Sequence, residues 1–114
     1  MSGCIFCRIA AKEAPAAIVH EDDEVVAFRD LHPQAPVHLL IIPRRHVASL
    51  GEAVDGDAPL LGRMLLVAKE LAVREKIDPR GWRLVTNRGV GAGQSVFHLH
   101  FHLLGGRGMG WPPG

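Results

Sequence analysis

The sequence predicts an α+β fold in a single domain, and two patterns indicate this class. Apolar residues recur at helical spacing over residues 59–76, while short apolar or alternating segments before and after them are typical of strands. A chain of 114 residues is long enough for one modest core and too short for two. We therefore expect one domain over residues 1–114, in which residues 105–114 form a C-terminal tail.

The first half of the chain predicts a short helix and three strands. Residues 4–11 suit a short helix, and residues 17–20 and 24–29 suit two strands that an Asp-Asp turn joins into a hairpin. Residues 37–42 form an apolar run that a single histidine interrupts, and prolines bound it on both sides. Because proline cannot continue the pairing of a central strand, this run predicts a buried strand with defined ends.

The second half predicts the long helix and two further strands. The helical pattern at 59–76 begins with a proline, which favours the first turn, and residues 78–81 break it. Residues 82–87 suit a strand, and the glycines of 89–93 predict a flexible connector to a final strand at 98–103. This order of strands, helix and strands is the basis of the α+β prediction.

The final strand carries the most informative pattern of the chain. His98, His100 and His102 alternate with apolar residues, so the two-residue repeat of a strand places the three imidazoles on one face. An imidazole acts as a nucleophile, proton donor or metal ligand near neutral pH, and the pattern therefore suits phosphate chemistry or metal binding. A half-exposed strand with outward polar residues is the structural alternative, although Thr, Lys or Glu would serve it equally well.

Charge and hydropathy argue against several classes of partner. The 13 Lys and Arg residues nearly balance the 12 Asp and Glu residues, which leaves no general field to attract nucleic acid or acidic lipid. A small phosphorylated molecule is the expected ligand. No apolar run approaches the roughly 20 residues of a membrane span, and the first residues lack a secretory signal. We expect a cytoplasmic protein without nucleic-acid or membrane partners.

The histidine pattern belongs to a longer segment, Gly93–Leu104, that resembles the signature of the histidine triad family. The resemblance extends over nearly the whole chain and points to the histidine triad nucleotide-binding branch of that family. The further segments that resemble this branch are Asp30–His38, Ile42–His46, Asn87, Leu104–Arg107 and Trp111–Gly114.

The resemblance implies a fold and an assembly. Members of the family have an antiparallel five-stranded sheet with one long helix and a short N-terminal helix. Two protomers join their sheets into one ten-stranded sheet, pair their long helices and bring the C-terminal tail toward the partner's site. We therefore expect a homodimer.

The resemblance also implies a purine nucleotide substrate and a mechanism. Members cleave the P–N bond of purine nucleoside 5′-phosphoramidates, such as AMP linked to an amine, through a covalent nucleotidyl-histidine and without a required cofactor. His100 matches the nucleophile, His102 matches a residue that hydrogen-bonds a phosphate oxygen, and His98 completes the triad. Ser95 matches the residue at the leaving group, unless it merely starts the strand. His38 matches a residue that hydrogen-bonds a triad member, unless it is a satisfied core histidine.

The family pattern further outlines the nucleotide pocket. Asp30 would accept from both ribose hydroxyls, because a carboxylate has two oxygens. Asn87 and Gln94 would order the phosphate end, or else are turn residues. Backbone N–H groups between Gly93 and Ser95 would receive the charge that develops at phosphorus. The pocket walls implied by the resemblance are Ile5, Phe6, Phe28, Leu31 and Leu40.

The two cysteines of the chain, Cys4 and Cys7, form a Cys-x-x-Cys pair. In a reducing cytosol such a pair is more often a metal or redox element than a structural disulfide. With His46 and His98 it completes the composition of a structural zinc site, and some members of the family bind zinc in this way. His98 would then be structural and not catalytic. The alternative is two reduced thiols that pack as small hydrophobes.

Three functions therefore remain under consideration. The first is hydrolysis of the P–N bond in a nucleoside phosphoramidate. The second is a dinucleoside polyphosphate hydrolase or nucleotidyl transferase with the same nucleophile, and the leaving group distinguishes it from the first. The third is a nucleotide-binding or zinc-binding interaction module with vestigial catalysis, against which the intact triad and Ser95 argue.

Overall fold

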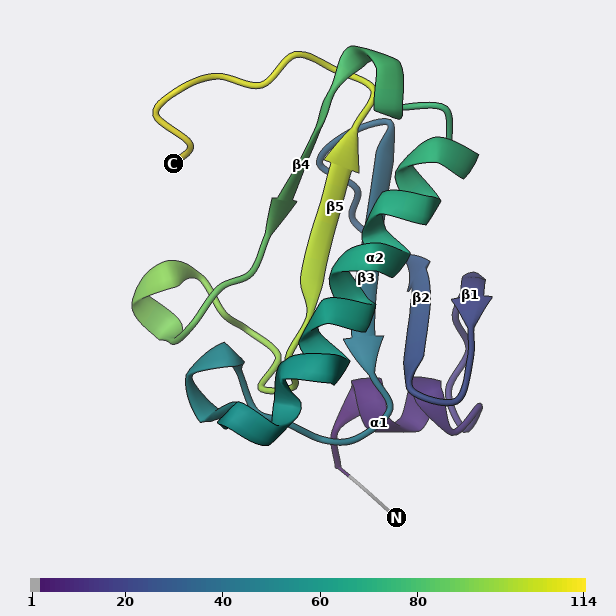
Figure 1. The fold of residues 1–114 in the computed structure, drawn as a ribbon, viewed down its shortest axis with the longest axis vertical. Coiled ribbons are helices and arrows are strands. Elements are labelled where there is room, and N and C mark those ends of the chain that lie inside the picture. The colour runs from purple at the N-terminus through teal and green to yellow at the C-terminus, as the bar shows by residue number, and fades with distance from the viewer. Residues whose placement is uncertain (1–2) are drawn as a thin grey trace.

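The computed structural model describes residues 3–114 as a five-stranded antiparallel sheet with two α-helices (Figure 1). The strands lie in the order β1-β2-β3-β5-β4, so β1 and β4 form the two edges. This confirms the α+β class. No helix within the described residues is long and apolar enough to cross a membrane. The elements are α1 Ile5–Ala10, β1 Ile18–Glu21, β2 Val25–Arg29, β3 Val37–Pro43, α2 Ala58–Arg74, β4 Trp82–Val85 and β5 Phe101–Gly105.

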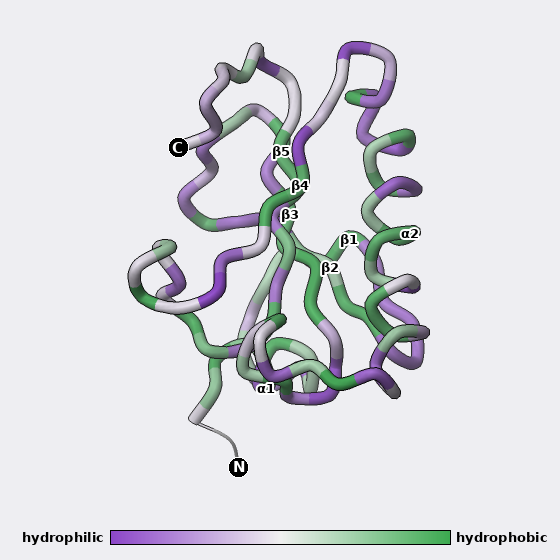
Figure 2. Tube along the Cα trace, turned by 60° about the vertical axis from the view of Figure 1, so that its left-hand side comes forward, coloured by the Kyte–Doolittle hydropathy of each residue, from purple (hydrophilic) through white to green (hydrophobic). Residues whose placement is uncertain are grey.

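The two helices cover opposite faces of the sheet, and Figure 2 shows α2 lying along one side of it. Leu39 and Ile41 of β3 pack with α2, whereas Leu40 and Ile42 pack with α1. Successive side chains of a strand point to opposite faces of the sheet. Because a helix covers each face here, the side chains of the strand are apolar on both faces. This explains why residues 39–42 of the central strand are all apolar.

Helix α2 begins and ends close to its expected positions. Pro59 lies in the first turn, where the missing N–H costs nothing. Just before it, the Asp57 carboxylate accepts from the Val54 N–H and pairs with the Arg45 guanidinium. The buried face of the helix consists of Leu60, Met64, Val67, Ala68, Leu71 and Ala72.

The final strand begins at Phe101 and not at His98, which corrects its expected start. Pro43 ends the neighbouring strand β3 and has no N–H with which to continue the ladder. Other contacts replace the ladder at this point. The His98 ring donates from Nε2 to the Pro43 carbonyl at 2.8 Å, and the Leu99 N–H donates to the Val47 carbonyl at 2.6 Å.

The alternation of side chains nevertheless continues ahead of the strand. Leu99 packs in the core on the α2 side of the sheet. The rings of His98 and His100 instead meet the Phe6 ring of α1 edge-on, with centroids 5.9 and 5.1 Å apart. The His102 ring lies 5.0 Å from that of His100. The three imidazoles therefore gather on the α1 side, as the repeat predicts.

Several other boundaries and one connector differ from the expectation. Strand β1 begins and ends one residue later, and β4 already ends at Val85. The connector that was expected to be flexible contains an ordered turn, Val90–Ala92, between Gly89 and Gly93. Both glycines have positive φ, 88° and 95°, a conformation that other residues rarely adopt. The glycines therefore shape this connector and do not simply loosen it.

Candidate active site

A pocket of about 330 Å³ opens on the α1 side of the sheet and reaches two members of the triad. Its volume falls in the range of small-molecule sites, and most of its wall is apolar with a few polar groups. The wall comes from α1 and the loop after it, from β2 and the loop after it, from β3, and from β5 and the segment that leads into it. The lining residues are Ile5, Phe6, Ile9, Pro15, Ala16, Phe28, Arg29, Asp30, Leu31, His32, Leu40, Ser95, Val96, His100 and His102.

Most residues that we expected in a nucleotide pocket line this cavity. They are Ile5, Phe6, Phe28, Asp30, Leu31, Leu40, Ser95, His100 and His102. Five expected site residues lie outside this lining. Gly93 and Gln94 belong to the preceding turn, Asn87 follows β4, His38 lies behind His102, and His98 faces another cluster.

Several lining residues were missed by the sequence analysis. Ile9 follows Ile5 and Phe6 at helical spacing, so the amphipathic pattern of a short helix is a signal that could have found it. Pro15 and Ala16 lie in a loop whose course depends on tertiary packing, and no local pattern marks them. The other missed residues are Arg29, His32 and Val96.

The side chain of Gln94 forms hydrogen bonds with the backbone around the turn before Ser95 and does not line the pocket. Its Oε1 accepts from the Gly89 N–H at 2.8 Å, while Nε2 donates to the carbonyls of Ala48 and Val96 at 2.8 and 3.1 Å. The side chain is buried, with 5% exposure. Both ends of the amide are therefore engaged with backbone, which is the arrangement of a turn residue.

The backbone holds His100 in one tautomer. Its Nδ1 lies 2.7 Å from the carbonyl oxygen of His98, which only accepts, so Nδ1 carries the proton of the ring. The Thr86 hydroxyl donates to the His100 carbonyl at 2.8 Å and fixes the main chain at this residue. In a neutral imidazole the other nitrogen, Nε2, then holds a lone pair. The pocket-lining ring thus offers a nucleophilic nitrogen.

A chain of hydrogen bonds sets the tautomer of His102. The Gln34 N–H donates to Nδ1 of His38 at 3.0 Å, so the proton of a neutral His38 lies on Nε2. That Nε2 is 2.9 Å from Nδ1 of His102, which accepts the hydrogen bond. His102 therefore carries its own proton on Nε2 and can donate it to a ligand in the pocket.

Burial keeps the imidazole rings of His38 and His102 uncharged at neutral pH. Loss of solvent is the main cause that lowers the pKa of His102 to about 4, and His100 and His38 add to the effect while Asp30 opposes it. Burial also lowers the pKa of His38, again against the opposing influence of Asp30. His102 is consequently a neutral hydrogen-bond donor and not a cation.

Asp30, His38 and His102 lie close enough to be considered as metal ligands, with ligand atoms within 4.8 Å of one another. The hydrogen bonds argue against this. Nε2 of His38, 3.4 Å from Oδ2 of Asp30, stays protonated while the Gln34 N–H occupies Nδ1, and a protonated nitrogen has no lone pair for a metal. Oδ1 of Asp30 accepts from the His32 N–H at 2.8 Å. The group is therefore suited to hydrogen bonding and not to metal binding.

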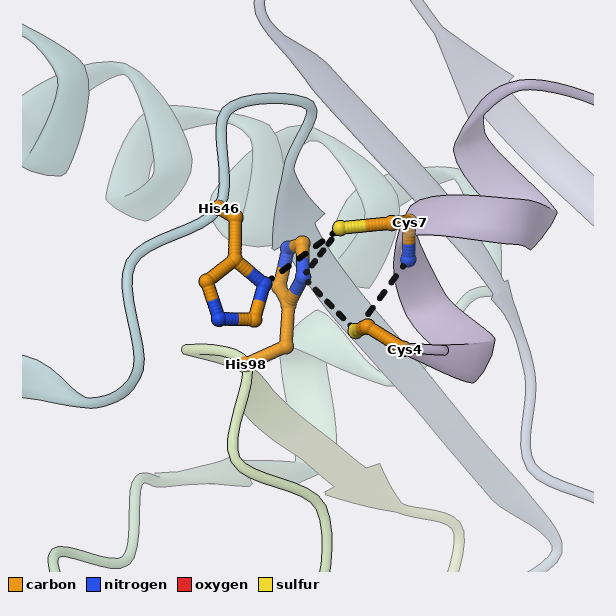
Figure 3. Close-up of side chains that lie close together, drawn as sticks. All are labelled: Cys4, Cys7, His46 and His98. Atoms are coloured by element: carbon orange, nitrogen blue, oxygen red, sulfur yellow. Dashed lines mark hydrogen bonds between the residues drawn. The ribbon is translucent and has the colours of Figure 1, made fainter. Parts of the chain in front are cut away.

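A separate cluster joins three distant segments beside the pocket (Figure 3). Cys4 caps α1, Cys7 lies within α1, His46 follows β3, and His98 precedes β5. Sγ of Cys4 is 3.3 Å from Nδ1 of His98, and Sγ of Cys7 is 3.3 Å from Nδ1 of His46 and 3.5 Å from Nδ1 of His98. All four ligand atoms lie within 4.8 Å of one another.

The donor set of this cluster fits zinc. Two thiolates and two imidazoles are a common composition of tetrahedral structural sites. Nε2 of His98 donates to the Pro43 carbonyl at 2.8 Å, which leaves the lone pair on Nδ1, the nitrogen that faces the cysteines. Burial lowers the pKa of His98 and so favours the neutral ring, the form that binds a metal.

Comparison with known proteins places the chain in a family. The family model described as "Scavenger mRNA decapping enzyme C-term binding" matches residues 3–110. An uncharacterized HIT-like protein of Synechococcus elongatus is 52% identical over 110 residues, which are 96% of this chain and 96% of that protein. The chain belongs to the histidine triad (HIT) family.

Solved histidine triad structures agree with this assignment. A HIT family hydrolase from Legionella pneumophila superposes with a TM-score of 0.97 at 53% identity, covering 98% of this chain and 100% of that one. A histidine triad nucleotide-binding protein from Candida albicans has a TM-score of 0.83 at 36% identity, covering 96% and 83% of the two chains. This histidine triad protein therefore shares its fold with a HIT family hydrolase and with a histidine triad nucleotide-binding protein.

Proposed function

We propose that this protein hydrolyses purine nucleoside 5′-phosphoramidates, such as AMP linked to an amine, through a covalent nucleotidyl-His100. One observation carries the proposal. The 2.7 Å contact from Nδ1 of His100 to the His98 carbonyl leaves Nε2 of a pocket-lining ring as a nucleophile before any substrate binds. The chemistry needs no cofactor.

The proposed reaction has two steps. In the first, Nε2 of His100 attacks the α-phosphorus, and the P–N bond breaks with its electron pair passing to the amine. The Ser95 hydroxyl, in the pocket wall, gives a proton to the departing amine and regains one from water. Nε2–H of His102 donates to a phosphoryl oxygen and stabilises the developing charge. In the second step water attacks the phosphorus, and the P–N bond to Nε2 of His100 breaks with its electron pair returning to the ring. The attacking water loses a proton to solvent, and AMP is released.

The pocket wall supports a nucleoside as the bound group. Ile5, Phe6 and Leu40 offer an apolar surface on which a purine base can lie. Asp30 has acceptor capacity beyond its hydrogen bond from the His32 N–H, and we propose that it accepts from the ribose hydroxyls. Leu31 is 86% exposed at the pocket, so a bound base would bury part of its side chain.

A second candidate function is cleavage of a phosphoanhydride, as a dinucleoside polyphosphate hydrolase or nucleotidyl transferase. The description of the matching family model names a decapping enzyme, and this supports phosphoanhydride cleavage as a candidate. The same His100 would attack, and a phosphate group would leave in place of an amine.

The leaving group decides between the candidates. We would compare kcat/KM for an AMP–amine substrate and for a diadenosine polyphosphate with the same preparation, and we expect far faster cleavage of the AMP–amine. The reverse order would establish the second candidate. Tight nucleotide binding without turnover of either substrate would end the catalytic proposal and favour an interaction module.

We also propose a structural zinc ion at Cys4, Cys7, His46 and His98, and a cytoplasmic location in which the thiols persist. The metal would hold α1 against the segment before β5 and take no part in phosphoryl transfer. Metal analysis of protein purified without chelator should find about one equivalent in the wild type and much less in Cys4→Ser. A wild type with less than about a tenth of an equivalent would contradict this.

A homodimer is the last part of the proposal. β4 is an edge strand, and α2 exposes Leu65 and Leu66 at 48% and 54%. An unpaired sheet edge and exposed leucines on a helix are both features that a second copy would cover. Arg83 of β4 donates to the Gly110 carbonyl in the tail at 3.0 Å, and Trp111 is 82% exposed. Light scattering should report a dimer at micromolar concentration, whereas a monomer with full activity would contradict the proposal.

A further inference from the structure

We infer that the cluster of Cys4, Cys7, His46 and His98 positions the nucleotide site, so that zinc and nucleotide bind cooperatively. The inference rests on the proposed zinc and nucleotide sites, and it concerns binding and not turnover. Two structural links join the cluster to the pocket. One runs through the chain from His98 to His100, and the other runs through α1.

The first link is His98 itself. This residue has 0% exposure, and its ring is held at both nitrogens. Nδ1 lies 3.3 and 3.5 Å from the thiols of Cys4 and Cys7, and Nε2 donates to the Pro43 carbonyl at 2.8 Å. The carbonyl of the same residue accepts from Nδ1 of His100 at 2.7 Å. A ligand that fixes His98 therefore also fixes the position of the carbonyl to which the nucleophile is hydrogen-bonded.

The second link is α1, which carries both cysteines and part of the pocket wall. Ile5 and Phe6 line the pocket and lie between Cys4 and Cys7 in the sequence. The helix has six residues, far fewer than an isolated helix needs, so contacts with the rest of the fold must hold it in place. A metal bound by the two thiols would anchor this short helix and, with it, the two side chains of the pocket wall.

His46 makes the link testable because it belongs to the cluster but not to the pocket. It is exposed, its Nδ1 lies 3.3 Å from Sγ of Cys7, and its ring meets that of His98 edge-on at 5.0 Å. Any effect of His46 on nucleotide binding must therefore pass through the cluster. Coupling between two sites is reciprocal, so zinc and nucleotide must change each other's affinity by the same factor.

The test measures AMP affinity by calorimetry for metal-free and zinc-loaded wild-type protein. We expect zinc to tighten AMP binding by at least about fivefold, and AMP to tighten zinc binding by the same factor. His46→Asn should reduce this effect of zinc to less than about twofold. His20→Asn is the matched control, because His20 pairs with Asp22 outside the cluster, and it should keep the full effect. Circular dichroism shows that each form is folded.

Equal AMP affinities of zinc-loaded and metal-free wild type, with one zinc bound, would overturn the inference, as would failure to bind zinc. A second measurement needs no nucleotide. Amide hydrogen exchange of α1 should be slower in the zinc-loaded protein than in the metal-free protein, because the metal would anchor this short helix, and equal exchange rates would count against the inference. Coupled binding in a protein that cleaves no phosphoramidate would refute the hydrolase proposal and leave this inference standing.

Discussion

The hydrogen bond from His38 to His102 should be needed for full activity. In His38→Leu, Nδ1 of His102 loses the donor that lies 2.9 Å away. The ring can then carry its proton on Nδ1, and in that tautomer Nε2 cannot donate to a phosphoryl oxygen. His38→Gln is the matched variant, because its side-chain amide still offers an N–H at this position.

The size of the effect follows from the burial of the pair. His38 is 6% exposed, so water replaces the lost donor poorly. A buried acceptor left without a partner costs about 1–3 kcal/mol. In His38→Leu this cost adds to the free energy of the tautomer of His102 that stabilises the transition state. Since about 1.36 kcal/mol corresponds to a factor of ten, kcat/KM falls by about 5- to 150-fold. Removal of a charge-stabilising donor altogether, about 100- to 1000-fold, sets the upper limit.

Steady-state release of AMP from an AMP–amine substrate measures this loss, together with the AMP affinity of each variant. We expect His38→Leu to lose kcat/KM within the stated range while it binds AMP almost as well as the wild type. His38→Gln should retain most of the activity. Wild-type kcat/KM in His38→Leu, or an equal loss in a folded His38→Gln, would refute the role assigned to this hydrogen bond.

Three further predictions concern stability. Burial lowers the pKa of His102 from 6.5 to about 4, so the unfolded chain binds more protons than the folded protein between these pH values. The free energy of unfolding should therefore fall by about 1–3 kcal/mol as the pH drops from 6.5 to 4. Urea titrations at both pH values check this, and an equal acid-induced loss in His102→Gln would contradict it. Gln94→Leu should cost about 2 kcal/mol by freeing the clamped backbone groups, with KM unchanged, whereas a raised KM at wild-type stability would place Gln94 at the ligand. Leu103→Ala should cost about 2–5 kcal/mol because its side chain is fully buried, and a loss below about 1 kcal/mol in the same titration would mean that this core position is loosely packed.

Features that depend only on neighbouring residues of the chain could be predicted from the sequence. The alternation of His98, His100 and His102 with apolar residues predicted their common face, because side-chain direction in an extended chain depends only on the backbone. The long helix was predictable for the same reason, since its apolar residues repeat with the helical period. Residues matched to the family pattern, such as Asp30, also fell in the pocket wall.

Other features depended on contacts between distant segments. The late start of β5 follows from the proline that ends β3, because Pro43 cannot continue the ladder. The tautomer of His38 depends on a backbone N–H of Gln34, and no sequence pattern records that hydrogen bond. Gln94 could have faced the phosphate or the turn, and only the path of the chain around Ala48 shows that it clamps the turn.

The nucleophile is the central element of the proposed mechanism, and a trapped intermediate tests it most directly. Wild-type protein and His100→Ala would be mixed with an AMP–amine substrate, quenched rapidly with alkali and analysed by intact mass spectrometry. We predict one adenylyl group on the wild type, none on the variant, and turnover lower by about 10³-fold or more in a variant that still binds AMP. Hydrolysis by His100→Ala at the wild-type rate, with no adenylylated wild-type protein, would contradict the mechanism.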